Sequence, residues 1–71
     1  MVTVDQIRSY CERMIAEHYL SGNAEGLRET QLALGVLMHA AEAAQDKDTA
    51  RQFRVLAAQA ANRREELMPE D

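Results

Sequence analysis

The sequence predicts an all-α protein, in which a helical hairpin is joined to a third helix to form a small three-helix bundle. Two observations predict this class. Residues with high helix propensity dominate the 71-residue chain, which contains only three Gly and one Pro. Apolar residues also recur at steps of three and four, the spacing that places them on one face of a helix. We expect a single domain, because a chain of this length has no room for a second.

The first helix is expected over residues 4–20. Thr3 and Gln6 have the spacing of a capping box, in which each side chain binds the backbone N–H of the other residue. One apolar face then follows at helical spacing, made of Val4, Ile7, Cys11, Met14 and His18. Gly22 can adopt the left-handed conformation that ends a helix, and Asn23 can cap the next one.

The second helix is expected over residues 24–44 and carries apolar side chains on two opposite sides. One stripe consists of Leu27, Thr30, Leu34, Leu37, Ala41 and Ala44, and the opposite side contains Leu32, Val36, His39 and Ala43. Two apolar sides predict a helix buried between two layers. We expect one side to close the hairpin against the first helix. The other side is left for the third helix, a second copy of the chain or a partner.

Gly35 lies between these two sides of the second helix. A glycine inside a helix costs about 0.5–1 kcal/mol relative to alanine. Two explanations stay open: the close approach of a neighbouring backbone, or a glycine that the helix simply tolerates.

The third helix is expected over residues 49–68, after a tight turn in which Asp46 or Asp48 is the N-cap. Because residues 46–49 contain neither Gly nor Pro, a single long helix is the alternative. Helical phase favours the turn, since the stripe of the second helix would continue onto charged Asp48 and Arg51. The third segment has its own apolar register, made of Phe53, Leu56, Ala57, Ala60 and Leu67. Pro69 should end this helix, with the last two residues frayed.

The third helix is rich in alanine and offers only a thin cover for the second, so we expect a homodimer with twofold symmetry. The alternative is a monomer in which the first and third helices cover both sides of the second. The residues assigned to a protein interface are Leu32, Gly35, Val36, His39, Phe53 and Arg64. Arg64 either packs its stem with its guanidinium in water or meets a carboxylate on a partner chain. A half-buried His39 would make association sensitive to pH.

The sequence contains no pattern typical of catalysis, cofactor binding or metal binding. It has no Gly-rich phosphate loop, nucleophile motif, HExxH motif or paired cysteines. Cys11 is the only cysteine, which excludes an intramolecular disulfide, and we interpret it as a small buried hydrophobe. His39 and Glu42 have the spacing of two metal ligands, but the further glutamates of a metal bundle are missing. We therefore expect no enzyme, no cofactor and no metal.

Charge and hydropathy exclude further classes of partner. The net charge of −4 opposes binding to nucleic acid or anionic lipid, and the arginines of the third helix do not line up on one side. The longest uncharged stretch, residues 30–41, is too short to span a bilayer. The first residues lack the pattern of a signal peptide, so we expect a cytoplasmic protein.

These observations predict a small, non-catalytic protein that homodimerises and acts by binding another protein, as an adaptor, a chaperone-like protein or an inhibitor. The alternative is an accessory regulator of transcription or of another nucleic-acid transaction, with weak DNA contact through the arginines of the third helix.

Overall fold

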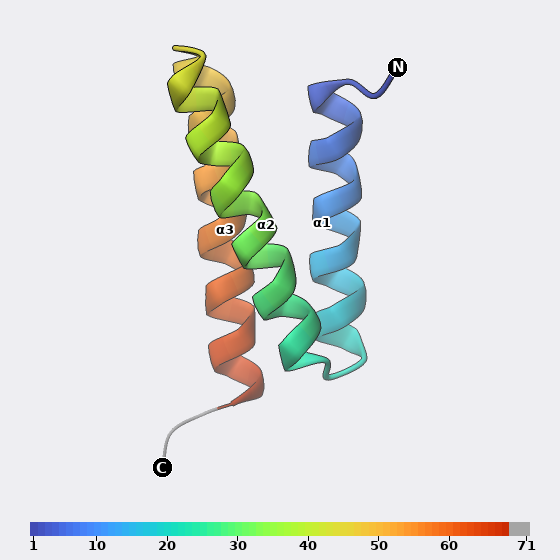
Figure 1. The fold of residues 1–71 in the computed structure, drawn as a ribbon. Helices are drawn as coiled ribbons and strands as arrows, with labels where there is room; N and C mark the ends of the chain where they lie inside the picture. Colours follow the sequence, from blue (N-terminus) through green and yellow to red (C-terminus); the bar gives the residue numbers. More distant parts are fainter. Residues whose placement is uncertain (69–71) are drawn as a thin grey trace.

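Three α-helices follow one another in alternating directions in the computed structural model, which describes residues 1–68. α1 spans Val4–Leu20, α2 spans Ala24–Ala43 and α3 spans Lys47–Leu67. α1 and α3 run in the same direction, and α2 runs against both (Figure 1). The all-α class and the packing of three helices are confirmed, and each helix begins and ends within two residues of its expected bounds. The expectation about residues 69–71 lies outside the described part of the chain.

α1 begins with the expected capping box. The Thr3 N–H donates to Gln6 Oε1 at 2.9 Å, and the Gln6 N–H donates to Thr3 Oγ1 at 3.1 Å. Arg8 then lies 3.7 Å from Asp5 and 3.0 Å from Glu12, one helical turn away on either side. These contacts are all local to α1, and they leave the buried Nε of Arg8 without a hydrogen-bond partner among the described residues.

The connection between α1 and α2 is a Schellman turn followed directly by an N-cap. Gly22 has a φ of 71°, and the Asn23 N–H donates to the His18 carbonyl at 2.8 Å. The Asn23 side chain in turn accepts the N–H of Gly26 at 2.9 Å. Gly22 therefore ends the first helix and Asn23 caps the second, as the sequence predicts.

The connection between α2 and α3 is also a Schellman turn followed by an N-cap, but it contains no glycine. Gln45 takes the left-handed position with a φ of 61°, and the Asp46 N–H donates to the Ala41 carbonyl at 2.9 Å. The Asp46 carboxylate accepts the Thr49 N–H at 3.2 Å and the Thr49 hydroxyl at 2.6 Å. This turn confirms two separate helices. Capping by Asp46 starts α3 at Lys47, two residues earlier than expected.

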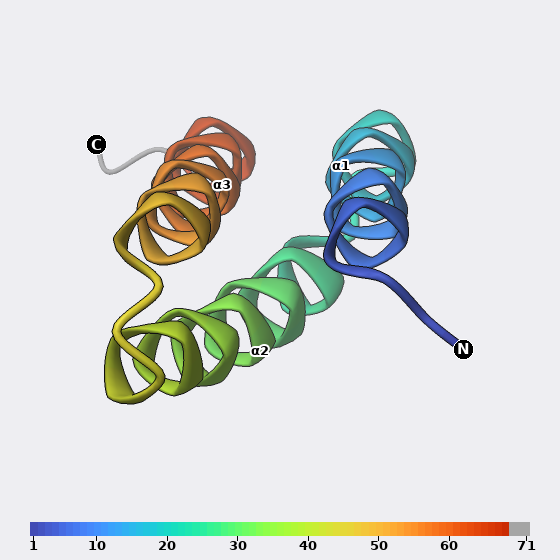
Figure 2. The same cartoon turned by 90° about the horizontal axis from the view of Figure 1, so that it is seen from above.

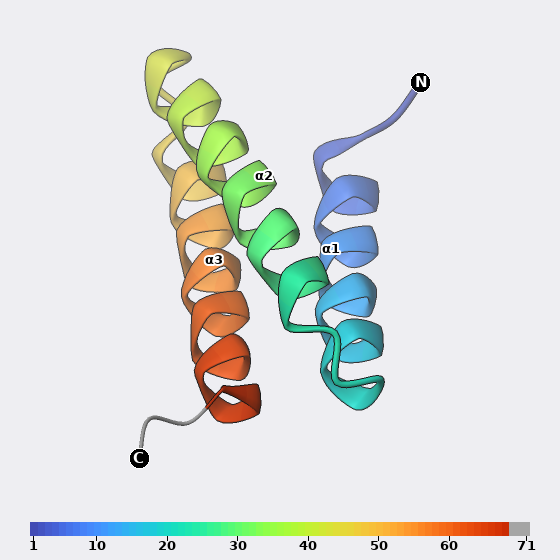
Figure 3. The same ribbon diagram turned by 60° about the horizontal axis from the view of Figure 1, so that its bottom comes forward.

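The core lies where α1 and α3 pack against the same side of α2 (Figure 2). Leu27 and Leu34 of α2 are fully buried at its centre. The buried cluster consists of Cys11, Ile15, Leu27, Leu34, Phe53, Leu56 and Ala60. The α2–α3 contact is the most extensive of the three, because small side chains such as Ala50 and Ala60 let the two helices approach closely. α1 instead diverges from α2 away from their connecting turn (Figures 1 and 3).

This arrangement contradicts the alternative in which α1 and α3 cover both sides of α2, so within a single chain α2 is not buried between two layers. Both neighbours share the side of α2 that carries Leu27 and Leu34, and neither covers the opposite side, where Leu32 and Val36 are exposed. The alanines of α3 make this possible, since they leave room for α1 and α3 on one side of α2. The Cα atoms accordingly extend over 41 × 24 × 14 Å, a flat shape.

Candidate protein interface

The side of α2 that faces away from α1 and α3 is the first candidate surface, and we call it the outer face of α2. Its members are Glu25, Arg28, Glu29, Leu32, Gly35, Val36, His39, Ala40, Glu42 and Ala43. The side chain of Val36 is 70% exposed and that of Leu32 is 56% exposed, although both lie in the middle of the helix. Exposed apolar side chains that are contiguous, rather than scattered, are typical of a binding surface.

Four of the six residues assigned to an interface lie together on this face, namely Leu32, Gly35, Val36 and His39. The other two lie on α3. Phe53 is only 3% exposed, because it fills the core beneath α2, and it is therefore not available to a partner. Arg64 is half-buried, and among residues 1–68 no carboxylate oxygen lies within 4 Å of its guanidinium.

The two glycines inside α2 have different surroundings. A Cβ on Gly35 would meet no heavy atom within 4 Å, so close approach within the chain does not explain this glycine. A Cβ on Gly26 would lie 2.5 Å from His18 Nδ1 and 2.7 Å from the side-chain nitrogen of Asn23. Gly26 is thus the site where α1 and α2 approach closely, and the sequence analysis did not single it out.

Charged residues mark the two ends of the outer face. Arg28 lies 3.4 Å from Glu25 near the beginning of α2, and Glu42 lies 3.5 Å from Arg54 near its end. The side chains of Arg28 and Glu42 are 50% and 47% exposed. Exposed pairs of this kind contribute little to folding, so both groups can also take part in contacts with another chain.

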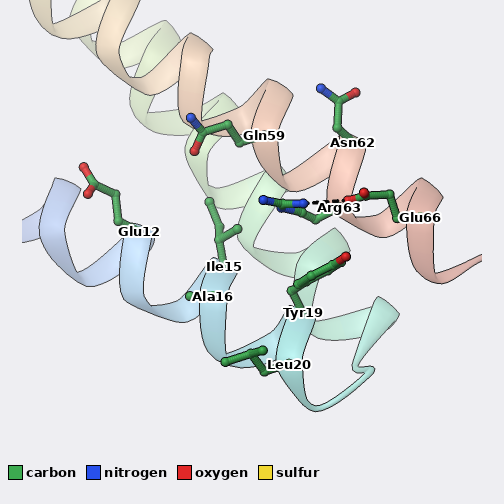
Figure 4. A pocket seen from close by; sticks show the side chains of 9 residues that line it. All are labelled: Glu12, Ile15, Ala16, Tyr19, Leu20, Gln59, Asn62, Arg63 and Glu66. Atoms are coloured by element: carbon green, nitrogen blue, oxygen red, sulfur yellow. Dashed lines mark hydrogen bonds and ion pairs between the residues drawn. The ribbon is translucent and has the colours of Figure 1, made fainter.

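A groove between α1 and α3 is the second candidate surface (Figure 4). It consists of two hollows of about 620 and 530 Å³ that share Glu12 and Gln59. In the larger hollow the Arg63 guanidinium lies 4.6 Å from the centre of the Tyr19 ring and 2.9 Å from Glu66. The hydrogen bond to Glu66 raises the pKa of Arg63, whose guanidinium is charged in any case, and the contact with Tyr19 links α3 to α1.

Cys11 is buried in the core and lines neither surface. Burial raises the pKa of the Cys11 thiol, which keeps it in the unreactive protonated form. Among residues 1–68, no three His, Cys, Asp or Glu side chains come together in a way that could hold a metal ion. Within the same residues, no helix combines the length and the apolar character needed to cross a membrane.

The arginines of α3 are divided between two places, since Arg51 and Arg54 line one hollow with Lys47 and Glu42, and Arg63 lines another. Arg54 lies beside Glu42, whereas Arg63 lies between Tyr19 and Glu66 on the side facing α1. Each of these two cations thus has a carboxylate within 4 Å, which weakens its attraction for phosphate.

Compared with models of protein families, with curated proteins and with solved structures, the chain shows no significant match to any of them.

Proposed function

We propose that this chain is a non-catalytic cytoplasmic protein that homodimerises through the outer face of α2 and acts by binding another protein. The observation that supports this proposal is the exposure of Leu32 and Val36 side by side in the middle of a helix. Large apolar side chains at such positions are stabilised when a second surface removes them from water.

The free energy that dimerisation gains by burying these side chains is comparable to the free-energy cost of association. Burying a Leu or Val side chain completely contributes about 1.5–3 kcal/mol. A symmetric dimer buries Leu32 and Val36 from both copies, which gives a gain of several kcal/mol. Because association itself costs about 4 kcal/mol or more, we expect a reversible dimer rather than a permanent one.

The groove between α1 and α3 is the surface that we assign to the protein partner, since it lies on the opposite side of α2 and stays open in such a dimer. α1 and α3 run in parallel, so a helix lying antiparallel between them would complete a four-helix bundle. Exposed Leu20 and Val55 lie along the groove and offer apolar contacts. Arg51 at one end favours an acidic residue there. We therefore expect an amphipathic partner helix with an acidic end.

Oligomeric state tests the dimer. In sedimentation velocity over a range of concentrations, the wild-type chain should approach twice its mass of 8.0 kDa as concentration rises. Val36→Glu should remain at 8.0 kDa with unchanged helical circular dichroism, because the carboxylate would be desolvated only in the dimer. Val55→Glu is the matched control, an exposed valine on another helix, and should dimerise like the wild type. A wild-type chain that is monomeric throughout would contradict the proposal.

Affinity capture from native lysate tests the partner site. The same two variants are used, but here Val55→Glu is the test variant and Val36→Glu is the control. A protein retained by the wild type and by Val36→Glu, but lost with Val55→Glu, would support the groove as the partner site. A wild-type chain that retains nothing more than Val55→Glu would contradict it. Retention of nucleic acid that rises steeply as salt falls would point instead to the alternative function in nucleic-acid transactions.

A further inference from the structure

The outer face of α2 contains a straight row of five residues with opposite charges at its ends. The row consists of Arg28, Leu32, Gly35, His39 and Glu42, which follow one another at steps of four and three. Its basic end and its acidic end are each seven positions from the central glycine. When two such rows lie antiparallel, the basic end of each row lies opposite the acidic end of the other.

We propose that a second copy of the chain lies antiparallel on this row, with the twofold axis passing beside Gly35. This inference rests on the homodimer proposed above and adds which residues meet. Because Arg28 and Glu42 are equally distant from the axis, each copy places its Arg28 opposite Glu42 of the second copy. Leu32 of one copy then faces the segment around His39 of the other.

The open space around Gly35 leaves room for a second copy of the chain to approach at this axis. Nothing in the chain lies within 4 Å of the position that a Cβ would take there, so the row has a hollow at its centre. Val36, the next residue, is 70% exposed, and the symmetry brings it beside the hollow of the second copy. The glycine lets the two backbones approach closely, which compensates in the dimer for a cost of about 0.5–1 kcal/mol that the monomer leaves uncompensated.

The charges select the antiparallel arrangement over the parallel one. Parallel copies in the same register would place Arg28 beside Arg28 and Glu42 beside Glu42. Antiparallel copies place each Glu42 between its own Arg54, 3.5 Å away, and Arg28 of the second copy. Each Arg28 similarly lies between its own Glu25, 3.4 Å away, and the second copy's Glu42. Acidic and basic groups therefore alternate along this edge of the dimer.

A charge exchange tests the register. Arg28→Glu and Glu42→Arg should each weaken dimerisation about tenfold, because two attractive contacts become repulsive in the symmetric pair. The double variant Arg28→Glu/Glu42→Arg should return to within about threefold of the wild-type dissociation constant. The control Arg13→Glu/Glu42→Arg has the same net charge, but it should stay as weak as Glu42→Arg, because Arg13 lies on α1.

Disulfide formation is a second test that does not depend on charge. In a chain carrying Cys11→Ser, the substitution Gly35→Cys places two thiols at the axis. Its side chain weakens association as that of Gly35→Ala does, so oxidation is carried out at a protein concentration high enough to populate the dimer and should yield a covalent dimer. Val55→Cys in the same background should not yield one, since the groove side of α3 faces away from the axis. Circular dichroism of every variant establishes that it is folded before its association is compared.

The outcomes separate this inference from the proposed function. A wild-type chain that never dimerises would overturn both. A wild-type dimer that the double charge exchange fails to restore, and that Gly35→Cys fails to cross-link, would overturn the register alone and leave the homodimer in place.

Discussion

Gly26 and Gly35 lie on the same helix, yet their neighbours give the two glycines opposite roles. The His18 ring and the Asn23 amide occupy the space that a side chain on Gly26 would need. The space around Gly35 is empty within the chain. Packing against α1 therefore requires a glycine at position 26. At position 35 the glycine has no packing role in the monomer and only lowers the helix propensity.

Gly35→Ala should stabilise the monomer and weaken the dimer. In the monomeric Val36→Glu background, we expect urea denaturation to show a gain of about 0.5–1 kcal/mol in the free energy of unfolding, because alanine favours the helix and meets no neighbour. In the wild-type background the added methyl group should raise the dimer dissociation constant. Gly26→Ala is the control and should give no gain, since it displaces His18 and the capping Asn23. Equal gains at both glycines would contradict this account.

At this scale the sequence predicted the helix caps and the buried character of Cys11, because these depend on neighbours in the chain or on apolar spacing. It did not predict the contact at Gly26, since the ring that fills this space comes from α1. Phe53 was placed in an interface for a similar reason. Its apolar character requires burial, but only the packing of α3 on α2 decides that the burial is internal.

The two turns connect their helices with the same hydrogen bonds but different residues at the left-handed position. Gly22 has a φ of 71°, and Gln45 has a φ of 61°. A side chain in this conformation costs about 1–2 kcal/mol, whereas glycine adopts it freely. The hydrogen bonds around Asp46 and the extensive contact between α2 and α3 offset this cost at the second turn.

Gln45→Gly should therefore stabilise the protein. We expect the free energy of unfolding to rise by about 0.5–1 kcal/mol, once the greater freedom of glycine in the unfolded chain is subtracted. Gly22→Ala, at the equivalent position of the first turn, should lower it by a similar amount. Thermal denaturation monitored by circular dichroism measures both, and a loss of stability in Gln45→Gly would show that this turn is not strained.

The N-cap of α3 should make stability depend on acid pH. The hydrogen bonds from the Thr49 hydroxyl and N–H lower the pKa of Asp46 below its ordinary value of 3.8. The folded state thus favours the carboxylate, so its stabilising effect is complete above the ordinary pKa and is lost as the pH falls through the lower folded value. The melting temperature should therefore fall between about pH 6 and pH 2.

Asp46→Asn isolates this effect, because the amide oxygen can still accept the N–H of Thr49 but carries no charge. Its melting temperature at neutral pH should be slightly below that of the wild type, and its decline in acid should be smaller. An identical decline in both proteins would assign the acid sensitivity to other carboxylates.

At the scale of elements the sequence predicted three helices and nearly all of their ends. Helix propensity, apolar spacing and capping residues act within a few positions, so they can be recognised without a tertiary structure. The second turn was the exception in its details, since a glutamine takes the place where glycine is usual.

The whole molecule consists of a tightly packed pair, α2 and α3, and a more loosely attached α1. Away from the connecting turn, α1 diverges from α2 and is separated from α3 by the groove. The cation–π contact between Arg63 and Tyr19 is one of the interactions that bridge it. Elements with fewer packed contacts open more easily than the rest of a domain.

Native-state hydrogen exchange should therefore show that α1 opens before α2 and α3. We expect amides near Cys11 and Ile15 to exchange faster than those near Leu34 and Phe53. Arg63→Ala should increase exchange by several-fold in α1 alone, because it removes the contact with Tyr19. Arg54→Ala is the control, since Arg54 pairs with Glu42 across the α2–α3 contact. Uniform protection of all three helices would contradict this description.

By itself, the sequence determined the helical class, the three elements, their caps and the existence of two apolar sides on α2. These properties follow from propensities and spacings along the chain. Only the tertiary structure decided that α1 and α3 share one of these sides and that Leu32 and Val36 remain in water. The reason is that both sides have a comparable apolar character. The choice depends on how closely the alanines of α3 let two helices fit beside Leu27 and Leu34.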